Sequence, residues 1–320
     1  MNSLVGFTGF VGSNIIAKGT FEGLYNSKNI ETAYGTSPEL LVYAGLPAEK
    51  FIANKAPKED KHKIQGAIDN IKKINPKKLI LISTIDVYPY PNHVDEDSFI
   101  DKTMLLPYGF NRLYLEEFVE RNFQDYMIVR LPGLFGKNIK KNFIYDFIHF
   151  IPTLLKEIKY QELSSKSDLI KSLYQNQHNG FYKCIATSEA RNVLRREFET
   201  IGFSALKFTD SRGKFQFYDL SNLWRDITIA LQHNIKKINM ATEPIRISEL
   251  YSFLMNKPFI NEFLQDNIPN YDFRSKYALV FGGRGGYLYD KIIIMKRIKD
   301  FVEAEKNEIS NFKYCMDKGQ

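Results

Sequence analysis

The stretch Leu4-Val5-Gly6-Phe7-Thr8-Gly9-Phe10-Val11-Gly12-Ser13-Asn14-Ile15 opens the chain and decides its fold. A short apolar run meets three evenly spaced glycines, and an apolar segment that suits a helix follows. This pattern predicts a β-strand that turns tightly at Gly6 and enters a helix, which Gly12 lets pack closely on the strand. Gly9 would let phosphate groups approach the backbone at the positive end of that helix. The stretch therefore predicts a site for the pyrophosphate of a dinucleotide.

The rest of the N-terminal half alternates between apolar runs and helix-like segments. Apolar runs at residues 40–45, 78–84 and 126–131 are typical of strands buried in a parallel sheet. Residues 58–73 and 111–121 carry apolar side chains at helical spacing. This alternation predicts an α/β fold with a Rossmann-type doubly wound parallel sheet. In such a sheet the ligand lies beyond the carboxyl ends of the strands.

The regular alternation fades after residue 140. Residues 143–175 look helical and rich in aromatic side chains, whereas the later part mixes short strands and helices. We therefore expect a second, smaller lobe of mixed α/β structure that binds the substrate. The expected dinucleotide-binding domain covers 1–140 and about 215–242, and the expected lobe covers 141–214 and 243–320.

The composition is that of an ordinary globular protein of 320 residues, with 44% hydrophobic and 25% charged residues. No apolar run approaches the length of a membrane helix, so no membrane association is expected. The first expected strand begins at about residue 3, which leaves no room for a signal peptide. Cys184 and Cys315 match no metal or redox spacing. Together these features favour a cytoplasmic protein.

The charge pattern favours a small anionic ligand over a nucleic acid. The net charge is +7, and the lysines are spread along the chain rather than gathered on one element. The simplest interpretation is a solvated basic surface; the functional one is attraction of a nucleotide. No metal site is expected, because the five histidines are scattered and the acidic cluster Asp95-Glu96-Asp97 suits a solvated loop.

Three motifs together resemble a known family. They are the glycine turn Gly6–Gly12, the strand end Ile82-Ser83-Thr84-Ile85-Asp86-Val87-Tyr88, and Tyr108-Gly109-Phe110-Asn111-Arg112. This combination resembles the extended short-chain dehydrogenase/reductase family, whose members act on nucleotide sugars as epimerases, dehydratases and reductases. The segment Arg130–Gly136 also looks like the strand and loop that follow the family's catalytic helix. The resemblance covers roughly the first 140 residues well and the rest thinly.

The resemblance implies a catalytic set of Thr84, Tyr108 and Arg112. Tyr108 would be the base that takes a hydroxyl proton, and Thr84 would hydrogen-bond the reacting oxygen. The family has lysine where this chain has Arg112; that lysine lowers the pKa of the tyrosine and holds the nicotinamide ribose. Arginine keeps the charge, but its planar fork is bulkier. Taken alone, a Tyr and an Arg four residues apart also suit a simple surface contact, and Thr84 also suits a capping role.

The sequence after the second expected strand gives a partial indication of which cofactor binds. An NAD enzyme usually carries an acid about twenty residues beyond the first glycine, at the end of the second strand. This chain has Tyr25-Asn26-Ser27-Lys28-Asn29 there, without an acid to repel a 2′-phosphate. Ser27 and Lys28 would bind that phosphate, which favours NADP and leaves NAD open; an ordinary polar turn is the alternative. The residues expected at the cofactor are Gly6, Thr8, Gly9, Phe10, Val11, Gly12, Asn26, Ser27, Lys28, Ala44, Gly45, Tyr108, Arg112 and Pro132.

Dehydratases of the family carry an Asp-Glu pair directly after the catalytic threonine. Here the two positions are Ile85 and Asp86, which argues against a standard dehydratase. Asp86 is either a shorter stand-in for the second acid or a surface carboxylate near a turn. The residues expected at the substrate are Asp86, Gly133, Asn142 and Arg274.

These features predict an NAD(P)-dependent nucleotide-sugar epimerase or oxidoreductase, with a possible place in surface-polysaccharide synthesis. The alternative is an NAD(P)-binding sensor or regulatory subunit that keeps the fold and has impaired catalysis, which Arg112 favours. A homodimer through a helix bundle that includes 111–121 is implied by the resemblance.

Overall fold

The computed structural model describes residues 1–264 and 268–317. The chain divides into two compact units, each built from separate segments. The first unit comprises Met1–Ile139, Lys214–Arg246 and Pro269–Ile298, and the second comprises Lys140–Gly213, Ile247–Ile268 and Lys299–Gln320. The expected second lobe included the whole of 243–320, whereas Pro269–Ile298 packs with the first unit. The last three positions of that expected lobe lie outside the described residues.

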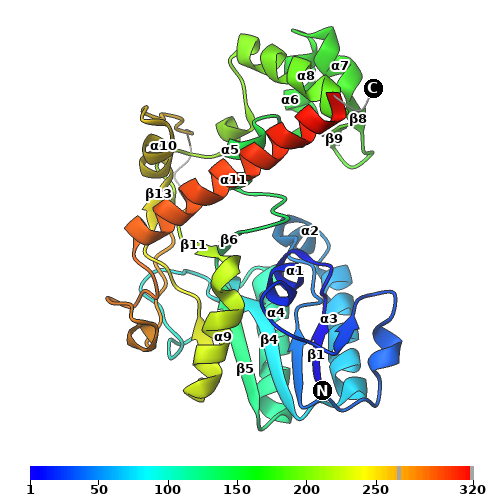
Figure 1. Ribbon diagram of the computed structural model, residues 1–320, viewed down its shortest axis with the longest axis vertical. Helices are drawn as coiled ribbons and strands as arrows, with labels where there is room; N and C mark the ends of the chain where they lie inside the picture. The colour runs from blue at the N-terminus through cyan, green and yellow to red at the C-terminus, as the bar shows by residue number, and fades with distance from the viewer. Residues whose placement is uncertain (265–267, 318–320) are drawn as a thin grey trace. The chain divides into compact units, whose positions relative to one another are not determined.

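The first unit contains a six-stranded sheet in the order β12-β5-β4-β3-β1-β2, and every neighbouring pair is parallel (Figure 1). Its strands are β1 (Asn2–Val5), β2 (Gly23–Tyr25), β3 (Leu40–Tyr43), β4 (Lys78–Thr84), β5 (Tyr126–Leu131) and β12 (Lys237–Asn239). The predicted Rossmann-type α/β sheet is confirmed. Because β1 has β2 on one side and β3 on the other, the strand order reverses there, and ligands of such sheets bind at that reversal.

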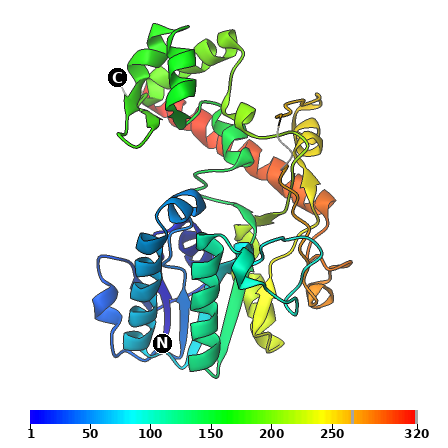
Figure 2. The same ribbon diagram turned by 180° about the vertical axis from the view of Figure 1, so that it is seen from behind.

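Helices cover both faces of this sheet. Figure 1 shows α1 and α9 in front of the strands, and Figure 2, seen from behind, shows α3 and α4 on the opposite face. These helices are α1 (Phe10–Ile16), α3 (Pro57–Ile74), α4 (Pro107–Asn122) and α9 (Leu223–Gln232), and α2 (Lys50–Lys55) precedes α3. The helices predicted over 58–73 and 111–121 are present. α4 starts earlier than predicted, because Pro107 occupies its first turn, where proline favours the helical backbone.

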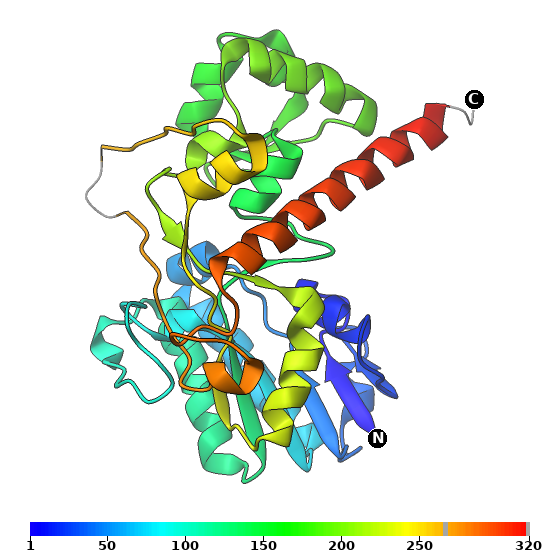
Figure 3. The same cartoon turned by 60° about the vertical axis from the view of Figure 1, so that its left-hand side comes forward.

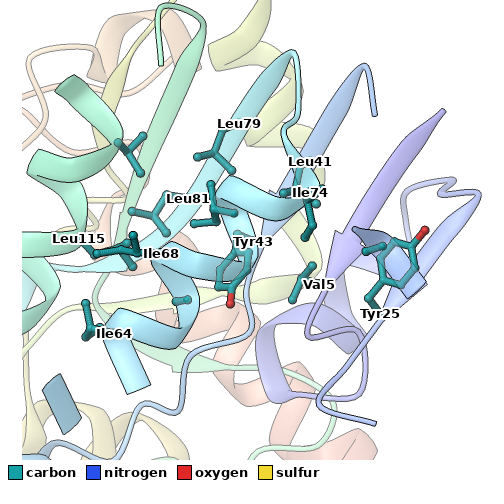
Figure 4. Close-up of a cluster of buried hydrophobic side chains, with 14 of the residues drawn as sticks. Val5, Tyr25, Leu41, Tyr43, Ile64, Ile68, Ile74, Leu79, Leu81 and Leu115 are labelled. Atoms are coloured by element: carbon teal, nitrogen blue, oxygen red, sulfur yellow. The ribbon is translucent and has the colours of Figure 1, made fainter. Parts of the chain in front are cut away.

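One part of the core of this unit lies between the sheet and helices α3 and α4. Figure 4 shows side chains from α3, such as Ile64 and Ile68, pointing at Leu79 and Leu81 of β4. Leu115 of α4 joins the same cluster. The helical spacing of the α3 isoleucines thus turns one stripe of the helix into the core, as the sequence predicts.

Shorter elements complete the first unit. Two short strands flank Gln216, whose side chain is buried and hydrogen-bonds backbone groups of Thr242 and Phe273. The two strands pair with different partners, β10 with β13 and β11 with β6. These strands are β6 (Gly133–Phe135), β10 (Lys214–Phe215), β11 (Phe217–Asp219) and β13 (Ile245–Arg246). The short 3₁₀ turns are η1 (Ile30–Ala33), η2 (Ile85–Val87), η3 (Lys102–Met104), η5 (Leu220–Asn222) and η6 (Ala278–Phe281).

The second unit packs helices on a small antiparallel sheet, β7-β9-β8 (green in Figure 3). Its strands are β7 (Leu154–Lys156), β8 (Tyr174–Asn176) and β9 (Phe181–Cys184). Its helices are α5 (Phe143–His149), α6 (Glu157–Ser164), α7 (Asp168–Leu173), α8 (Ser188–Ile201) and α10 (Ile247–Met255), with η4 (Ala205–Phe208). The all-helical prediction for 143–175 is wrong at β7 and β8, because both strands are defined by pairing with β9 farther along the chain.

The unit boundary falls within α11 (Lys291–Asp317). Among the described residues, none of the helices combines the length and apolar character that a membrane crossing requires.

Candidate functional site

The glycine turn is imposed by contacts between backbone atoms. Gly6 has φ +89°, and a Cβ there would lie 2.5 Å from the carbonyl oxygen of Ala44. Its N–H donates to the carbonyl of Tyr25 at 2.7 Å, which joins the turn to β2. A Cβ on Gly12 would lie only 2.1 Å from the Gly6 oxygen, so α1 touches the turn directly. Both positions exclude every other residue type unless the backbone moves.

Gly9 differs from the other two glycines. It is exposed, and a Cβ there would meet only the Gly6 oxygen, at 3.2 Å. The fold therefore demands glycine less strongly here, and the backbone before α1 is left open to solvent. Thr8 beside it is also exposed, while Phe10 and Val11 are half-buried in the first turn of α1. The first N–H groups of a helix lack partners within the helix, and they accept an anion well.

Two more predicted cofactor segments lie at the same edge of the sheet. Ala44 and Gly45 follow β3, where the Ala44 N–H donates to the Val5 carbonyl at 2.9 Å. Gly45 is exposed, and a Cβ there would press on the Val5 side chain at 2.9 Å. These residues therefore lie directly beside the glycine turn, at the reversal of strand order.

The segment after β2 forms a tight polar turn. The Asn26 side chain accepts a hydrogen bond from the Lys28 N–H at 2.9 Å, and the Asn26 N–H donates to Asn29 at 2.7 Å. Ser27 and Lys28 are exposed at the tip of the turn. The turn follows Tyr25, which receives the Gly6 N–H, so it also lies at the carboxyl edge of the sheet.

Thr84 and Tyr108 are brought together across the end of β4. Thr84 is the last residue of β4, Tyr108 lies in the first turn of α4, and their side chains are close enough to interact. Gly109 makes this contact possible, since a Cβ there would lie 2.0 Å from the backbone oxygen of Asp86. A glycine directly after the motif tyrosine is the sequence signal for this close approach.

A buried ion pair fixes α4 on the sheet below the two hydroxyls. Glu116 of α4 pairs with Arg130 of β5 at 2.6 Å, and both side chains are 1% exposed. Ser83, the neighbour of Thr84, donates its hydroxyl proton to Glu116 at 2.5 Å. The pair and this hydrogen bond set the position of Tyr108 relative to the end of β4.

Arg112 is committed to partners that the sequence did not indicate. Its guanidinium forms a two-point ion pair with Asp60 of α3, at 2.9 and 3.0 Å, and donates to the Pro47 carbonyl at 2.9 Å. It also stacks on the Tyr108 ring, 4.4 Å from the ring centre. Its side chain is only 4% exposed. In the described structure Arg112 therefore supports the Tyr108 ring and joins α4 to α3.

The pKa of Tyr108 is raised above its ordinary value. Burial is the largest cause, and the charge of Asp86 adds to it. The Arg112 charge and the Thr84 hydrogen bond act in the opposite direction. The cation four residues away thus lowers the pKa as expected, but burial of the phenol outweighs its effect. Tyr108 is uncharged at neutral pH.

A lysine from another element reaches the same cluster. Lys50 of α2 forms an ion pair with Asp86 at 2.6 Å and also interacts with the Tyr271 hydroxyl. The Asp86 charge raises the pKa of Lys50 against the effect of burial. Sequence reasoning missed Lys50 and Tyr271, because neither belongs to a motif and both lie far from Asp86 in the chain.

The remaining predicted residues are less closely grouped. Pro132 follows β5, and Gly133 begins β6 with its backbone paired to Phe217. The Arg274 guanidinium lies 3.6 Å from the Asp272 carboxylate, between Nη2 and Oδ2, and it stacks over the Tyr287 ring.

Asn142 belongs to the second unit. Its side chain caps α5 by accepting the N–H groups of Ile144 and Tyr145, at 2.9 and 3.2 Å.

No family model matches the sequence, and no curated protein matches it either. Solved structures do match. RMD from Pseudomonas aeruginosa, complexed with NADPH, has a TM-score of 0.61 and 13% identity over 96% of this chain and 100% of that chain. UDP-glucose 4-epimerase from Thermotoga maritima, with UDP-glucose, has a TM-score of 0.58 and 15% identity over 97% and 100% of the two chains.

UDP-glucuronic acid 4-epimerase from Bacillus cereus, a tyrosine-to-phenylalanine mutant with NAD and a fluorinated UDP-glucuronic acid, has a TM-score of 0.56 and 17% identity over 98% and 100% of the two chains. The solved structures that match include NAD(P)-dependent epimerases, dehydratases and reductases of nucleotide sugars. The fold of this chain is therefore that of the nucleotide-sugar enzymes of the short-chain dehydrogenase/reductase family, as its motifs predict.

Proposed function

We propose that this protein is an NAD(P)-dependent enzyme that moves a hydride to or from a nucleotide-linked sugar. The neighbouring hydroxyls of Thr84 and Tyr108 carry this proposal. They lie at the same carboxyl edge of the sheet as the glycine turn, where ligands of doubly wound sheets bind. The fold shared with NAD(P)-dependent nucleotide-sugar enzymes supports the same reaction class.

The glycine turn suits a dinucleotide pyrophosphate. The exposed Gly9 leaves the backbone at the start of α1 open to a ligand. The space beside Gly6 and Gly12, in contrast, is occupied by the protein's own backbone atoms. Ala44 and Gly45 would line the path toward Thr84. The bound nicotinamide would supply the hydride acceptor or donor. We favour NADP over NAD, because the exposed Lys28 suits a 2′-phosphate and no acid stands in the Asn26 turn.

The side chains would divide the proton chemistry between them. Tyr108 would exchange the hydroxyl proton at its phenol oxygen, and Thr84 beside it would hold the Tyr108 hydroxyl in place. Arg112 would hold the Tyr108 ring rather than the ribose, because its guanidinium is bound to Asp60 and Pro47. Return of the hydride to the opposite face of the sugar gives an epimerase, and release of the product gives a dehydrogenase or reductase.

Replacement of Tyr108 by phenylalanine tests the proposal. We expect turnover to fall by about 100-fold or more, since the proton exchange is lost. NADP⁺ binding stays, because the glycine turn is unchanged. The assay uses NADP(H) and NAD(H) with UDP-glucose, UDP-glucuronic acid and dTDP-4-dehydrorhamnose. Tyr114→Phe is the matched control, since Tyr114 lies on the same helix and is 41% exposed. Unchanged turnover in the Tyr108 variant would exclude the proposed mechanism.

A sensor or regulatory subunit is the second candidate. The raised pKa of Tyr108 and the locked Arg112 favour it, because both depart from an activated tyrosine. Thermal unfolding separates the two functions. Stabilisation by NADP⁺ alone, without a further increase with any of the three nucleotide sugars, supports the sensor. A further increase with one sugar supports the enzyme.

A further inference from the structure

We propose that Asp86 is the base that finally accepts the substrate proton, and that Thr84 passes the proton to it from Tyr108. Lys50 is the positioning residue that holds Asp86 for this task. The inference rests on the proposed hydride-transfer function and assigns a proton path that the three motif residues alone do not provide.

The path runs through adjacent polar side chains. Thr84 interacts with the Tyr108 phenol, and its Oγ1 donates to Oδ2 of Asp86 at 3.4 Å. The other carboxylate oxygen, Oδ1, accepts from Nζ of Lys50 at 2.6 Å. Exposure increases along the path, from 5% for Tyr108 to 20% for the Asp86 side chain and 42% for that of Lys50. The path therefore leads from the buried phenol to solvent.

The cation that stacks on Tyr108 cannot take the proton. Arg112 never gives up its proton at accessible pH, and its buried guanidinium is held by Asp60. Tyr108 is itself uncharged at neutral pH, since its pKa is raised, so it takes up a proton only while it releases its own. Thr84 beside it donates to the carboxylate of Asp86, and we assign this carboxylate as the group that accepts the proton.

The step balances as follows in the oxidative direction. The C–H bond of the carbinol breaks, and its hydride passes to the oxidised nicotinamide. The hydroxyl proton passes to the Tyr108 oxygen as Tyr108 gives its own proton to Thr84 and Thr84 gives its proton to the Asp86 carboxylate. The carbinol becomes a ketone, and the carboxylic acid of Asp86 then loses the proton to water. Reduction runs through the same transfers in reverse.

Charged and titratable groups surround Asp86 from each element packed on it. Lys50 comes from α2, Tyr108 from α4, and Tyr271 from the third segment of the first unit. Lys50 is the cation among them, and it also interacts with the Tyr271 hydroxyl. Its positive charge attracts the Asp86 carboxylate across the 2.6 Å contact and holds it in place.

The first test is the pH dependence of turnover with the best of the three nucleotide sugars. In Asp86→Asn we expect turnover at pH 7 to fall by about 100-fold and the acidic limb of the profile to disappear. Asp69→Asn, an exposed carboxylate on α3 bonded to Gln65, is the matched control and keeps the parent profile. A profile of Asp86→Asn like that of Asp69→Asn overturns the proposal.

Lys50 has its own matched pair. In Lys50→Met we expect the acidic limb to move to higher pH, and in Lys50→Arg we expect it to return toward the parent position. Lys55→Met removes a charge from the same helix, where Lys55 lies over the Phe51 ring, and leaves the limb in place. Equal profiles for the two methionine variants overturn the role of Lys50.

A second readout needs no substrate. Near-ultraviolet titration of each variant, minus that of the same variant carrying Tyr108→Phe, isolates the ionisation of Tyr108. Asp86→Asn should move this ionisation to lower pH, and Lys50→Met should move it to higher pH; unchanged titrations overturn the coupling. If no sugar is turned over, the proposed function fails and this titration decides the coupling alone. If Tyr108→Phe loses turnover and Asp86→Asn keeps it, only the proton path fails.

Discussion

Helices α4 and α5 both bury ionisable side chains, but they do so by opposite means. On α4, Arg112 and Glu116 each form an ion pair with a buried partner of opposite sign. On α5, burial raises the pKa of Asp146 to about 7 and lowers that of His149 to about 4, with the charge of Arg191 also acting on His149. Both α5 groups are thus driven toward their uncharged forms.

The difference separates geometry from pH response. A two-point ion pair defines distances and directions, and it changes little across neutral pH. Burial of an uncharged group costs less free energy than burial of a charged one, but the protonation of the group then differs between the folded and the unfolded chain. We therefore expect α4 to be sensitive to the loss of one partner and α5 to be sensitive to pH.

Loss of Asp60 is the strongest test of this contrast. In Asp60→Ala the buried Arg112 has no opposite charge, so the free energy of unfolding should fall by about 3–5 kcal/mol. Urea denaturation measures the change. Asp69→Ala, on the exposed face of the same helix, should stay within about 0.5 kcal/mol of the parent. Equal losses of unfolding free energy in the two variants would show that the Arg112–Asp60 ion pair does not stabilise the fold.

Replacement of Arg112 by lysine is a milder form of the same test. Lysine keeps the charge but loses the two-point bond to Asp60 and the bond to Pro47, so stability should fall by about 2 kcal/mol. Turnover should not rise, because Asp60 would also hold the lysine away from Tyr108. A large rise in turnover would mean that the arginine impairs a site that otherwise needs the family's lysine.

The pH response of α5 is the next largest effect. Asp146 binds an extra proton in the folded state between its unfolded pKa of 3.8 and about 7, so its contribution to stability is lost as pH rises through that window. His149 has the opposite sign, because the unfolded chain binds the extra proton between about 4 and 6.5. In the unsubstituted protein, the contributions of Asp146 and His149 to the pH dependence of the unfolding free energy therefore have opposite signs.

Single substitutions should reveal each slope. In Asp146→Asn the unfolding free energy should rise by about 1 kcal/mol per pH unit between pH 4 and 6.5, because only His149 remains. In His149→Gln it should fall with pH by a similar amount. Urea denaturation at several pH values across this range measures the unfolding free energy. The same pH dependence in the unsubstituted protein and in both variants would contradict the buried, uncharged forms of Asp146 and His149.

The smallest effect concerns how the two helices begin. Asn142 caps α5 with its own side chain, whereas the Tyr108 N–H of α4 donates to Asn54 of another element at 2.9 Å. Asn142→Ala should cost about 1 kcal/mol, and Asn142→Gly less, since φ at this position is +101°. A loss of nucleotide-sugar binding in the glycine variant, with stability kept, would instead support the substrate contact predicted from the sequence.

The sequence was informative wherever backbone geometry or apolar periodicity sets the structure. The sequence predicts the turn at Gly6 and Gly12, because a side chain at either position would collide with backbone atoms. The strand that ends at Thr84 is readable because its apolar run is buried on both faces. Both signals lie within a few residues of the feature that they predict.

The charge partners of the site were not readable. Arg112 invited comparison with a ribose-binding lysine, but Asp60 neutralises it from a helix whose sequence shows only an amphipathic pattern. Lys50 and Tyr271 meet at Asp86 from segments that no motif connects. Ion pairs between distant segments follow from the packed fold, so a single sequence does not specify them.

The division of the first unit into three segments of the chain has a consequence for synthesis. Tyr271 belongs to the last of these segments, Pro269–Ile298, and the whole of Lys140–Gly213 is translated before it. On the ribosome the glycine turn, the sheet strands up to β5 and the Lys50–Asp86 pair emerge early, while Tyr271 is still untranslated. The nascent protein thus acquires the carboxyl edge of these strands first, and Tyr271 joins Lys50 only when nearly the entire chain has been made.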